Sequence, residues 1–560
     1  MSGPDLPTSI PPIQDAATLH REGRLDEAEK VYKSILKTRR DDFDALHLLG
    51  LLNHQRGKAG EAYRLIVSAL KVNPRSADAL SNMALVLHAL KRDAEALASL
   101  DKALALAPGH IDALNNRGNL LLELNRPAEA LAAFDQVLAL AQRHVLARIN
   151  RGNALAQLGR AEQAVADYDA ALAMQPGNPH AFYNKGNALR LLGREADAIA
   201  AYDRALSAMP VHLSAWQNRG LALAALNRPQ EALESYRKAL AIQGDHADAN
   251  FNEALALLTL GDYRRGFEKY EWRWKRTGMS AKPRFRQRLW LGEYPLANKT
   301  ILLHAEQGLG DTIQFARYAP LLARAGATVV IEAPPELKEL FSGLQGVTAV
   351  VGRGDPLPHF DVQCPLASLP LACKTELANV PADVPYLRAS EERTRRWRER
   401  IEALSAPRVA IAWSGRATHL NDSNRSIALA ALEPLLATPG ARFISIQREL
   451  RPGDAERLAA DPRITHVGDD LADFSDTAAV LALCDLAICV DTSAAHLAAA
   501  MGRPTFILVP FQADWRWTAD SDRSPWYPQA RLFRQPVPGD WSSILRLVSE
   551  TLASRGSTVT

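Results

Sequence analysis

The stretch RINRGNALAQLGRAEQAVADYDAALAMQP (148–176) returns in similar form as FYNKGNALRLLGREADAIAAYDRALSAMP (182–210). The two segments begin 34 residues apart and share a Gly-Asn-Ala-Leu run, a Leu-Gly-Arg turn and a Tyr-Asp pair at matching positions. A fixed period between about 20 and 50 residues is typical of proteins built from stacked structural repeats. This period therefore predicts a repeat architecture for the part of the chain around it.

Small residues recur at the same period throughout the first half. Glycine or alanine lets two helices pack closely, and proline sits where a helix must stop. One small column consists of Gly50, Ala84, Gly118, Gly152, Gly186, Gly220 and Ala254, and a second of Ala28, Ala62, Ala96, Ala130, Ala164, Ala198 and Ala232. Pro74, Pro108, Gln142, Pro176 and Pro210 end the units. Each unit is predicted to be a helical hairpin that stacks on its neighbours, so residues 9–280 should form an all-α solenoid with a groove. The pattern resembles the tetratricopeptide repeat family.

An asparagine column keeps the same spacing, while the position before it varies freely. Its members are Asn82, Asn116, Asn150, Asn184, Asn218 and Asn252. A primary amide carries one acceptor and two donors, so a row of them can pair with the backbone of an extended peptide whatever its side chains are. The row resembles the asparagine ladder of eukaryotic O-GlcNAc transferase, which implies a peptide-binding groove. The alternative is that these amides bond between adjacent repeats and stabilise the stack.

Composition excludes several classes of protein but selects none. The chain is 47% hydrophobic and 23% charged, as in ordinary globular proteins, and 560 residues suffice for several domains. A net charge of +3 gives no sign of nucleic acid or an anionic membrane as the main partner. The four cysteines form no Cys-x-x-Cys pair, and no basic-then-apolar leader opens the sequence. We expect a cytoplasmic protein without an integral membrane segment.

The pattern changes after a basic, aromatic stretch, for which residues 281–297 are the expected linker. Short apolar runs then alternate with amphipathic stretches, which favours parallel strands joined by crossover helices. The predicted strands are 301–305, 327–333, 408–413, 442–446, 486–490 and 505–509. The charged segment EERTRRWRERIEAL (391–404) separates two Rossmann-like halves, 298–390 and 391–555, with a cleft expected between them.

Two loops at predicted strand ends carry the candidate chemistry. HAEQGLGDTIQFARY (304–318) places Gly308 and Gly310 beside Asp311 at a helix start, without the third glycine of a dinucleotide site or the lysine of a P-loop. CVDTSAAHLAAAMGRP (489–504) leads from Asp491, Thr492 and Ser493 directly into a helix. Unpaired N–H groups at such a helix start favour a diphosphate.

The two loops together resemble the inverting glycosyltransferases of the heptosyltransferase family, whose fold is called GT-B. The resemblance covers roughly residues 298–555 and implies that a Gly-Asp turn supplies the general base and that the later Asp-Thr…His segment touches a nucleotide-sugar. Asp311 is then the catalytic residue, with Glu306 and His304 in reserve; the alternative is that Asp311 only caps its helix. The expected donor-binding residues in the two loops are Gly308, Gly310, Asp491, Thr492, Ser493 and His496, although His496 could equally be a core histidine. Ser414, at the end of a predicted strand, and Arg425 are two further donor-binding candidates. Arg425 stands in for the family's lysine near the phosphates.

The two halves predict an enzyme that moves a sugar from a nucleotide-sugar to Ser or Thr of a protein held by the repeats. Chains of this architecture resemble bacterial flagellin glycosyltransferases, which makes flagellin a candidate acceptor. No cofactor, metal or nucleic acid is expected. The alternatives are a transferase acting on lipopolysaccharide or another surface polysaccharide, and a non-catalytic scaffold. Trp515, Trp517, Trp526 and Tyr527 are expected to pack in a core rather than line a sugar site.

Overall fold

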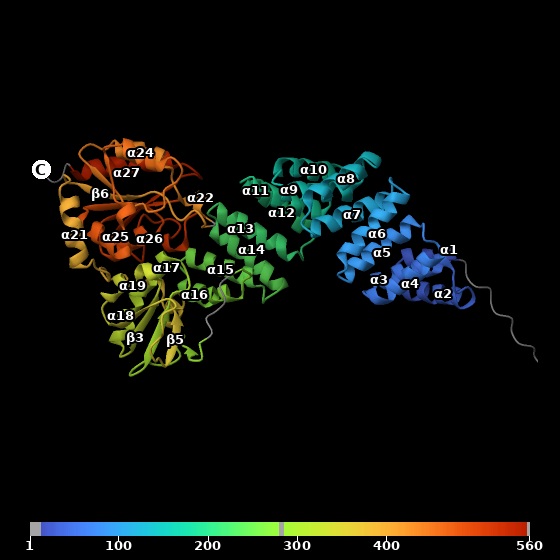
Figure 1. The fold of residues 1–560 in the computed structure, drawn as a ribbon, viewed down its shortest axis with the longest axis horizontal. Helices are drawn as coiled ribbons and strands as arrows, with labels where there is room; N and C mark the ends of the chain where they lie inside the picture. Colours follow the sequence, from blue (N-terminus) through green and yellow to red (C-terminus); the bar gives the residue numbers. More distant parts are fainter. Residues whose placement is uncertain (1–12, 279–284, 420, 557–560) are drawn as a thin grey trace, which may run out of the picture. The chain divides into compact units, whose positions relative to one another are not determined.

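The computed structural model describes residues 13–278, 285–419 and 421–556 (Figure 1). Helical hairpins fill the first half, and two parallel sheets flanked by helices follow. The predicted combination of an all-α repeat array and an α/β region is confirmed.

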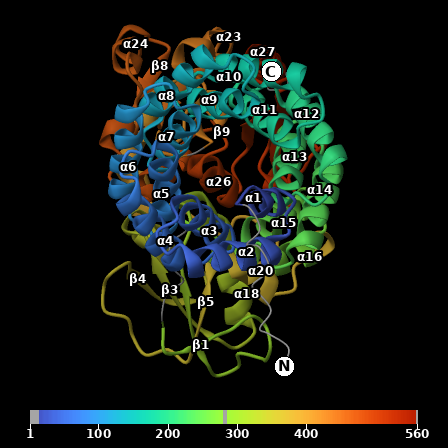
Figure 2. The same ribbon diagram turned by 90° about the vertical axis from the view of Figure 1, so that its right-hand side faces the viewer.

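The repeats are antiparallel helix pairs, and in residues 13–211 the first helix of each pair lies on the inner side of the curve, as Figure 2 shows. These helices are α1 (Ile13–Arg21), α2 (Leu25–Thr38), α3 (Phe43–Gln55), α4 (Ala59–Val72), α5 (Ala77–Ala89), α6 (Asp93–Leu106), α7 (Ile111–Glu123), α8 (Pro127–Leu140), α9 (Val145–Gln157), α10 (Ala161–Met174), α11 (Pro179–Leu191) and α12 (Glu195–Ala208). The glycine column has a steric cause. A Cβ on Gly152 would lie 2.7 Å from the Tyr168 ring, and one on Gly186 would lie 2.5 Å from the Tyr202 ring. Only glycine lets the two helices of these hairpins approach so closely.

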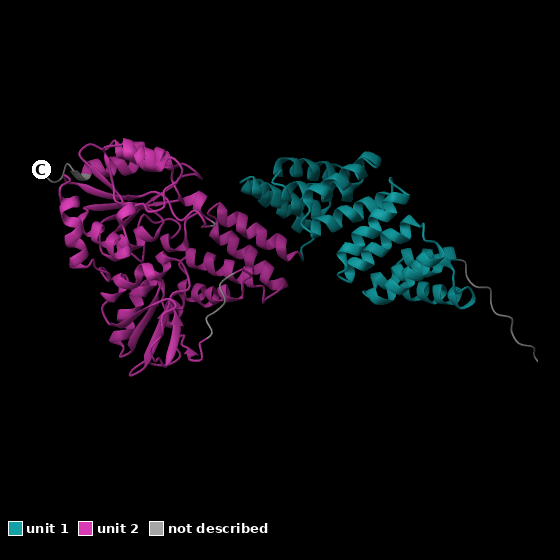
Figure 3. Cartoon of the chain, in the orientation of Figure 1, with its two compact units in different colours: residues 1–211 teal, residues 212–560 magenta. Residues whose placement is uncertain are grey.

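The chain divides into two compact units, residues 1–211 and 212–560 (Figure 3). The boundary between these units falls inside the repeat array. The last two hairpins therefore belong to the unit that holds the sheets; their helices are α13 (Leu213–Ala225), α14 (Pro229–Ile242), α15 (Ala247–Thr259) and α16 (Tyr263–Tyr270), followed by the short η1 (Glu271–Lys275). The reason is apolar packing, because Tyr263, Phe267 and Tyr270 share one buried cluster with residues of both sheet regions.

The first sheet, sheet A, has five parallel strands in the order β1-β5-β2-β3-β4. Its elements are β1 (Arg288–Leu289), β2 (Thr300–His304), α17 (Leu309–Phe315), η2 (Ala316–Tyr318), α18 (Ala319–Arg324), β3 (Thr328–Ala333), α19 (Pro335–Ser342), β4 (Val347–Gly352), β5 (Val362–Pro365), η3 (Leu366–Ser368), α20 (Leu369–Ala372) and η4 (Leu377–Asn379). Residues 281–284 of the expected linker lie outside the described residues. Its later part joins the sheet edge, because Arg288 and Leu289 pair with Val362 and Gln363.

The second sheet, sheet B, has six parallel strands in the order β11-β10-β9-β6-β7-β8. Its elements are α21 (Glu391–Glu402), β6 (Arg408–Ala412), α22 (Asp422–Arg425), η5 (Leu429–Leu432), α23 (Glu433–Leu436), β7 (Arg442–Ser445), α24 (Asp454–Ala460), β8 (Ile464–His466), η6 (Gly468–Asp470), α25 (Phe474–Leu483), β9 (Leu486–Val490), α26 (Ser493–Ala500), β10 (Thr505–Val509), η7 (Trp515–Trp517), β11 (Ala530–Arg534) and α27 (Trp541–Gly556). Counted from β6, this is the 3-2-1-4-5-6 order of a Rossmann sheet.

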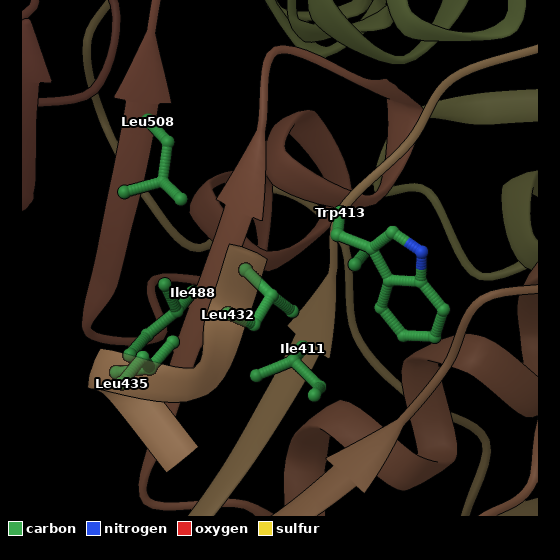
Figure 4. A pocket seen from close by; sticks show the side chains of 7 residues that line it. Ile411, Trp413, Leu432, Leu435, Ile488 and Leu508 are labelled. Carbon is green, nitrogen blue, oxygen red and sulfur yellow. The ribbon is translucent and has the colours of Figure 1, made fainter. Parts of the chain in front are cut away.

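A small apolar void lies under sheet B, lined by side chains of β6, η5, α23, β9 and β10 (Figure 4). It holds about 10 Å³, and Ile411, Leu432 and Ile488 are among its walls. A space that admits barely one water and offers that water no polar partner is a packing defect. It is not a ligand site.

Candidate active site

Sheet B brings the predicted loop 489–504 and the segment with Ser414 to one edge. Strands β6 and β9 are neighbours, and the strand order reverses between them. Ligands of open parallel sheets bind outside the carboxyl ends of the strands at such a switch point. Ser414 follows β6, and Asp491, Thr492 and Ser493 follow β9, so these four predicted residues lie at the same switch point.

The start of α26 is prepared for an anion. Thr492 occupies the N-cap position, yet no side chain in the described part of the chain caps the helix, and residues 491–494 are partly exposed. The first-turn N–H groups of a helix and its dipole both favour negative charge. The neighbouring Ser414 is 4% exposed, and its Oγ has no hydrogen-bond partner within the described residues. Both features point toward a polar ligand at this edge.

Arg425 links the two loops. Its Nη1 donates to the Asp491 carbonyl oxygen at 3.1 Å. The guanidinium lies across Gly415, where a Cβ would come within 2.5 Å of Nη2. Gln447, which the sequence did not single out, holds the backbone of the first loop: its Oε1 accepts from Ser414 N, and its Nε2 donates to Ser414 O, both at 3.1 Å. The structure thus places a guanidinium beside the start of α26.

His496 is a buried, neutral imidazole. It is 5% exposed, its Nδ1 lies 3.0 Å from the Tyr527 hydroxyl, and its ring packs at a tilt against Trp517 with centroids 5.1 Å apart. Burial, then the positive charges of Arg516, Arg317 and Arg425, holds its pKa well below the usual value. His496 therefore adds no positive charge to the site.

Asp491, at the same edge, has a raised pKa. Burial, followed by repulsion from Asp514, raises its pKa to about 6. Its Oδ1 lies 3.9 Å from His496 Nε2, which is beyond hydrogen-bond distance.

Asp311 stands at the facing loop, after β2 of sheet A. Its Oδ2 accepts from the Gly308 N–H at 3.0 Å, so it does cap α17. Its Oδ1 accepts from Arg516 Nη2 at 2.5 Å. The carboxylate remains 27% exposed, so capping does not bury it.

The two loops meet because α17 packs on α26 (Figure 1). A Cβ on Gly310 would lie 2.9 Å from His496 Cδ2 and 3.6 Å from Ser493 Cα. Gly310 is thus required for the close approach. The Asp311 turn of one half consequently lies beside the helix start of the other.

Arg516 is the main site residue that sequence reasoning missed. It is 7% exposed, and it bonds to Asp311, to Asp514 Oδ1 at 2.8 Å and to Gln314 Oε1 at 2.5 Å. Trp515 and Trp517 flank it in the sequence. All four aromatic residues expected to pack, Trp515, Trp517, Trp526 and Tyr527, are indeed buried. Its position between Trp515 and Trp517, two tryptophans expected to be buried, could have indicated from the sequence that Arg516 is a buried charge.

This aromatic cluster also reaches the last repeat hairpin. Trp526 Nε1 donates to the Tyr263 hydroxyl at 3.1 Å, and the Trp515 ring packs against Phe267 with centroids 5.6 Å apart. Arg516, which bonds to Asp311, therefore directly follows a tryptophan, Trp515, that contacts α16.

The two reserve candidates lie deeper than Asp311. His304 is 1% exposed, and its Nε2 lies 2.8 Å from Gln363 Oε1. Glu306 accepts from Arg273 Nη2 at 3.1 Å and from Ala367 N at 3.2 Å, and burial raises its pKa to about 7. Both are tied to neighbouring strands and loops.

The asparagines of the repeats lie on the first helices of their hairpins and are all partly exposed. Three of them donate across the stack. Asn82 Nδ2 lies 2.8 Å from His47 Nε2, Asn116 Nδ2 donates to Ser81 Oγ at 3.1 Å, and Asn150 Nδ2 donates to Asn119 Oδ1 at 2.7 Å. Each of these three amides still has its oxygen and one N–H beyond that bond. The same side chains can therefore stabilise the stack and bind a peptide.

Known protein families match the repeat half and the α/β half of the chain separately. Models described as tetratricopeptide repeat match residues 75–143, 115–179, 150–212 and 214–246. The model of glycosyltransferase family 9 (heptosyltransferase) matches residues 462–511. That segment runs from β8 to β10 and contains the Asp491–His496 loop. The chain thus carries tetratricopeptide repeats, and the second match supports a glycosyltransferase.

Protein FlbA of Caulobacter vibrioides is 26% identical over 292 residues, which is 47% of this chain and 48% of that protein. The chain therefore matches about half the length of this relative. Among solved structures, a tetratricopeptide repeat protein from Parabacteroides merdae is 20% identical with a TM-score of 0.37, covering 44% of this chain and 97% of the other. YrrB, described as a TPR protein with an unusual peptide-binding site, is 26% identical with a TM-score of 0.29, covering 33% and 95%.

The described residues contain neither a cluster suited to a metal ion nor a helix able to cross a membrane. The second half has one Asp-x-Asp triplet, Asp520 to Asp522, whose acids are both exposed, and no group of three His, Cys, Asp or Glu side chains within the described residues is arranged to hold a metal ion. Across the same residues, no helix combines the length and apolar character needed to cross a membrane.

Proposed function

We propose that this protein transfers a sugar from a nucleotide-sugar donor to a Ser or Thr hydroxyl of a protein held by the repeats. The observation that carries the proposal is the contact between α17 and α26, which sets the Asp311 carboxylate beside the uncapped helix start at the sheet B switch point. A proton acceptor and an anion site that face each other are the two requirements of this reaction.

At the donor end, the diphosphate lies against the first N–H groups of α26, at Thr492 and Ser493. Negative charge grows on the leaving phosphate as the sugar bond breaks, and preorganised N–H groups and Arg425 stabilise it there. Since His496 is neutral, Arg425 supplies the positive charge. Ser414 and the glycines Gly308, Gly310 and Gly415 complete the walls, and no divalent metal takes part.

At the acceptor end, Asp311 removes the proton from the attacking hydroxyl. Arg516 fixes the orientation of the carboxylate, and its partial exposure leaves room for a substrate oxygen. The hydroxyl attacks from the face opposite the leaving phosphate, so the anomeric configuration inverts.

The repeats hold the acceptor polypeptide through Asn82, Asn116, Asn150, Asn184, Asn218 and Asn252. The side-chain amides of this row pair with the peptide backbone, each hydrogen bond contributing roughly 0.5–1.5 kcal/mol. Flagellin is a candidate acceptor on grounds of architecture, and the reaction is placed in the cytoplasm.

The test is co-expression with candidate acceptors, flagellin among them, followed by intact-mass measurement. A mass increment on Ser or Thr of the acceptor is expected with the full chain. Removal of residues 1–211 should abolish it while leaving nucleotide binding by 212–560 intact, measured as thermal shifts with UDP, GDP, ADP and CMP. Truncation at residue 280 is unsuitable because α15 and α16 contribute to the core of the second unit. Unmodified acceptors throughout would refute the proposal.

A second candidate acceptor follows from the heptosyltransferase match: lipopolysaccharide or another surface polysaccharide, with the repeats serving only for recruitment. This function predicts a labelled glycan and no mass increment on any protein.

A further inference from the structure

The repeats contain a groove between α8, α9 and α10, within the first unit. It holds about 350 Å³ and has Leu131 and Leu155 among its apolar walls. Its polar walls include Arg151, Arg160 and Asp167. Arg151 directly follows Asn150 of the asparagine row in the sequence.

Arg160 departs from a pattern that five other repeats follow. An arginine before the second helix of a hairpin bonds to an acid three residues later; the pairs are Arg24–Glu27, Arg92–Glu95, Arg126–Glu129, Arg194–Asp197 and Arg228–Glu231. In the groove, Arg160 Nε donates instead to the neutral Gln163 Oε1 at 2.7 Å. Among the described residues, no carboxylate forms an ion pair with Arg160.

A second departure occurs in the same repeat. Asp167 is 4% exposed, whereas the equivalent residues of the adjacent repeats are Ala133 and Ala201. Its carboxylate accepts two bonds from Arg151, at 2.6 and 2.7 Å, and lies 3.6 Å from Arg148 Nη1. Arg151 also bonds to Asp135 at 3.0 Å. The groove is lined by two arginines, Arg151 and Arg160, and two aspartates, Asp135 and Asp167. Both carboxylates are bonded to Arg151, so neither is paired with Arg160.

We propose that this groove binds an acidic side chain of a protein partner, with the carboxylate on Arg160 and a neighbouring apolar residue on Leu131 and Leu155. The inference rests on the proposed function in taking the ligand to be a polypeptide held by the repeats. It adds that the polypeptide carries Asp or Glu next to an apolar residue.

The geometry of Arg160 suits a carboxylate. Its Nε is occupied by Gln163, and the two terminal nitrogens present parallel donors, which match the two oxygens of an acid. Asp167 and Asp135 hold Arg151 in place, so the groove is arranged before the ligand arrives. Ligands of this kind bind less tightly as salt increases.

The sharpest test gives Arg160 an acid three residues later, as in the five repeats named above. Gln163→Glu gives Arg160 the intramolecular acid that its counterparts have. The pKa values of Glu95, Glu129 and Glu231 are lowered by hydrogen bonds from their arginines, so a glutamate at position 163 will be ionised. Since sister repeats carry this pair, the variant should fold and melt like the parent. The matched control is Glu129→Gln, which frees Arg126 outside the groove.

Random 12-residue peptides are selected by display against the immobilised full-length protein, and their affinities are then measured for both variants. We expect selected peptides to carry Asp or Glu beside an apolar residue, to lose about tenfold in affinity for Gln163→Glu, and to bind Glu129→Gln like the parent. This readout requires no sugar transfer, so it is independent of the catalytic proposal.

Three results would overturn the inference. The first is selection of peptides without acids, or of none. The second is equal binding of acidic peptides by Gln163→Glu. The third is self-association in sedimentation experiments that Gln163→Glu removes, which would assign the groove to a second copy of this chain.

Discussion

The two sheets have equivalent switch points that are used in opposite ways. In sheet A the strand order reverses between β2 and β5, and the chain's own side chains occupy the carboxyl ends: Glu306 bonds to Arg273, whose Nη2 also donates to Ser368 Oγ at 2.7 Å. Ser368 in turn donates to Glu271 at 2.7 Å. In sheet B the same position presents an uncapped helix start, the Ser414 hydroxyl and Arg425.

The difference shows how the repeats are attached to the α/β region. Arg273 and Glu271 belong to η1, which directly follows the last repeat hairpin. The position at which a Rossmann-like sheet ordinarily binds a ligand is therefore filled, in sheet A, by the end of the repeat array. In the proposed function, the nucleotide binds at sheet B, and sheet A contributes Asp311 from the rim.

The largest expected effect is on sugar transfer, and it distinguishes the partly exposed Asp311 from the buried Glu306, both of which follow β2 of sheet A. Asp311→Asn should lower sugar transfer by about 10²–10⁴-fold, because the hydroxyl loses its proton acceptor, while thermal shifts with nucleotides stay unchanged. Glu306→Gln is the matched control: it keeps the bonds to Arg273 and Ala367 and should leave transfer nearly intact. Equal loss in both variants would mean that sheet A has its chemistry at Glu306.

The next prediction concerns the filled switch point itself. Arg273→Met leaves Glu306 and Glu271 without their buried cation and should cost about 3–5 kcal/mol in the stability of the second unit. All ten tryptophans lie between residues 216 and 541, so tryptophan fluorescence during urea unfolding reports on that unit alone. The double variant Arg273→Met, Glu306→Leu should recover part of the loss. A wild-type curve for Arg273→Met would show that the network does not attach the repeats.

How far the sequence predicts these features depends on the range of the interactions. The repeats follow from their period, and six strands follow from apolar runs. The strands β1, β4, β5, β8 and β11 were missed. Of these, β1 and β8, with two and three residues, are too short to give such a signal. Glycine and aspartate directly after predicted strands located both loops, since the carboxyl ends of parallel strands share an edge.

The residues that complete the site come from far along the chain. Arg516 lies 205 residues from Asp311, and Ser368 lies 95 residues from Arg273. Neither has a local motif, because the pairing depends on how strands from separate segments align. The depth of Glu306 against the partial exposure of Asp311 is likewise a tertiary property, so the sequence could rank these two acids only by resemblance.

A smaller effect tests the cost of keeping an acid at the sheet B switch point. The folded-state pKa of Asp491, about 6, exceeds its usual value of 3.8. Between these two values the unfolded chain binds fewer protons than the folded one, so this residue makes stability fall as pH rises from about 4 to 6 and leaves it low above that. Asp491→Asn should therefore gain of order 3 kcal/mol at pH 7 and less than about 1 kcal/mol at pH 4. Melting curves at both pH values measure this difference, with the exposed Asp520→Asn as control; a pH-independent gain would contradict the assignment.

The smallest expected effect compares two serines in the two switch points. Ser414 Oγ is buried without a partner, so Ser414→Ala should leave stability unchanged or raise it by up to about 1 kcal/mol. Ser368 bonds to both Arg273 and Glu271, so Ser368→Ala should cost about 1–3 kcal/mol. Nucleotide binding should respond in the reverse order, weakening a few-fold for Ser414→Ala and not for Ser368→Ala, as measured by thermal shift. A serine whose loss weakens binding but not folding has a role in ligand binding. If Ser414→Ala binds nucleotides like the parent, its hydroxyl contributes to neither stability nor binding. The contrast between the sheets then rests on Arg425 and the start of α26 alone.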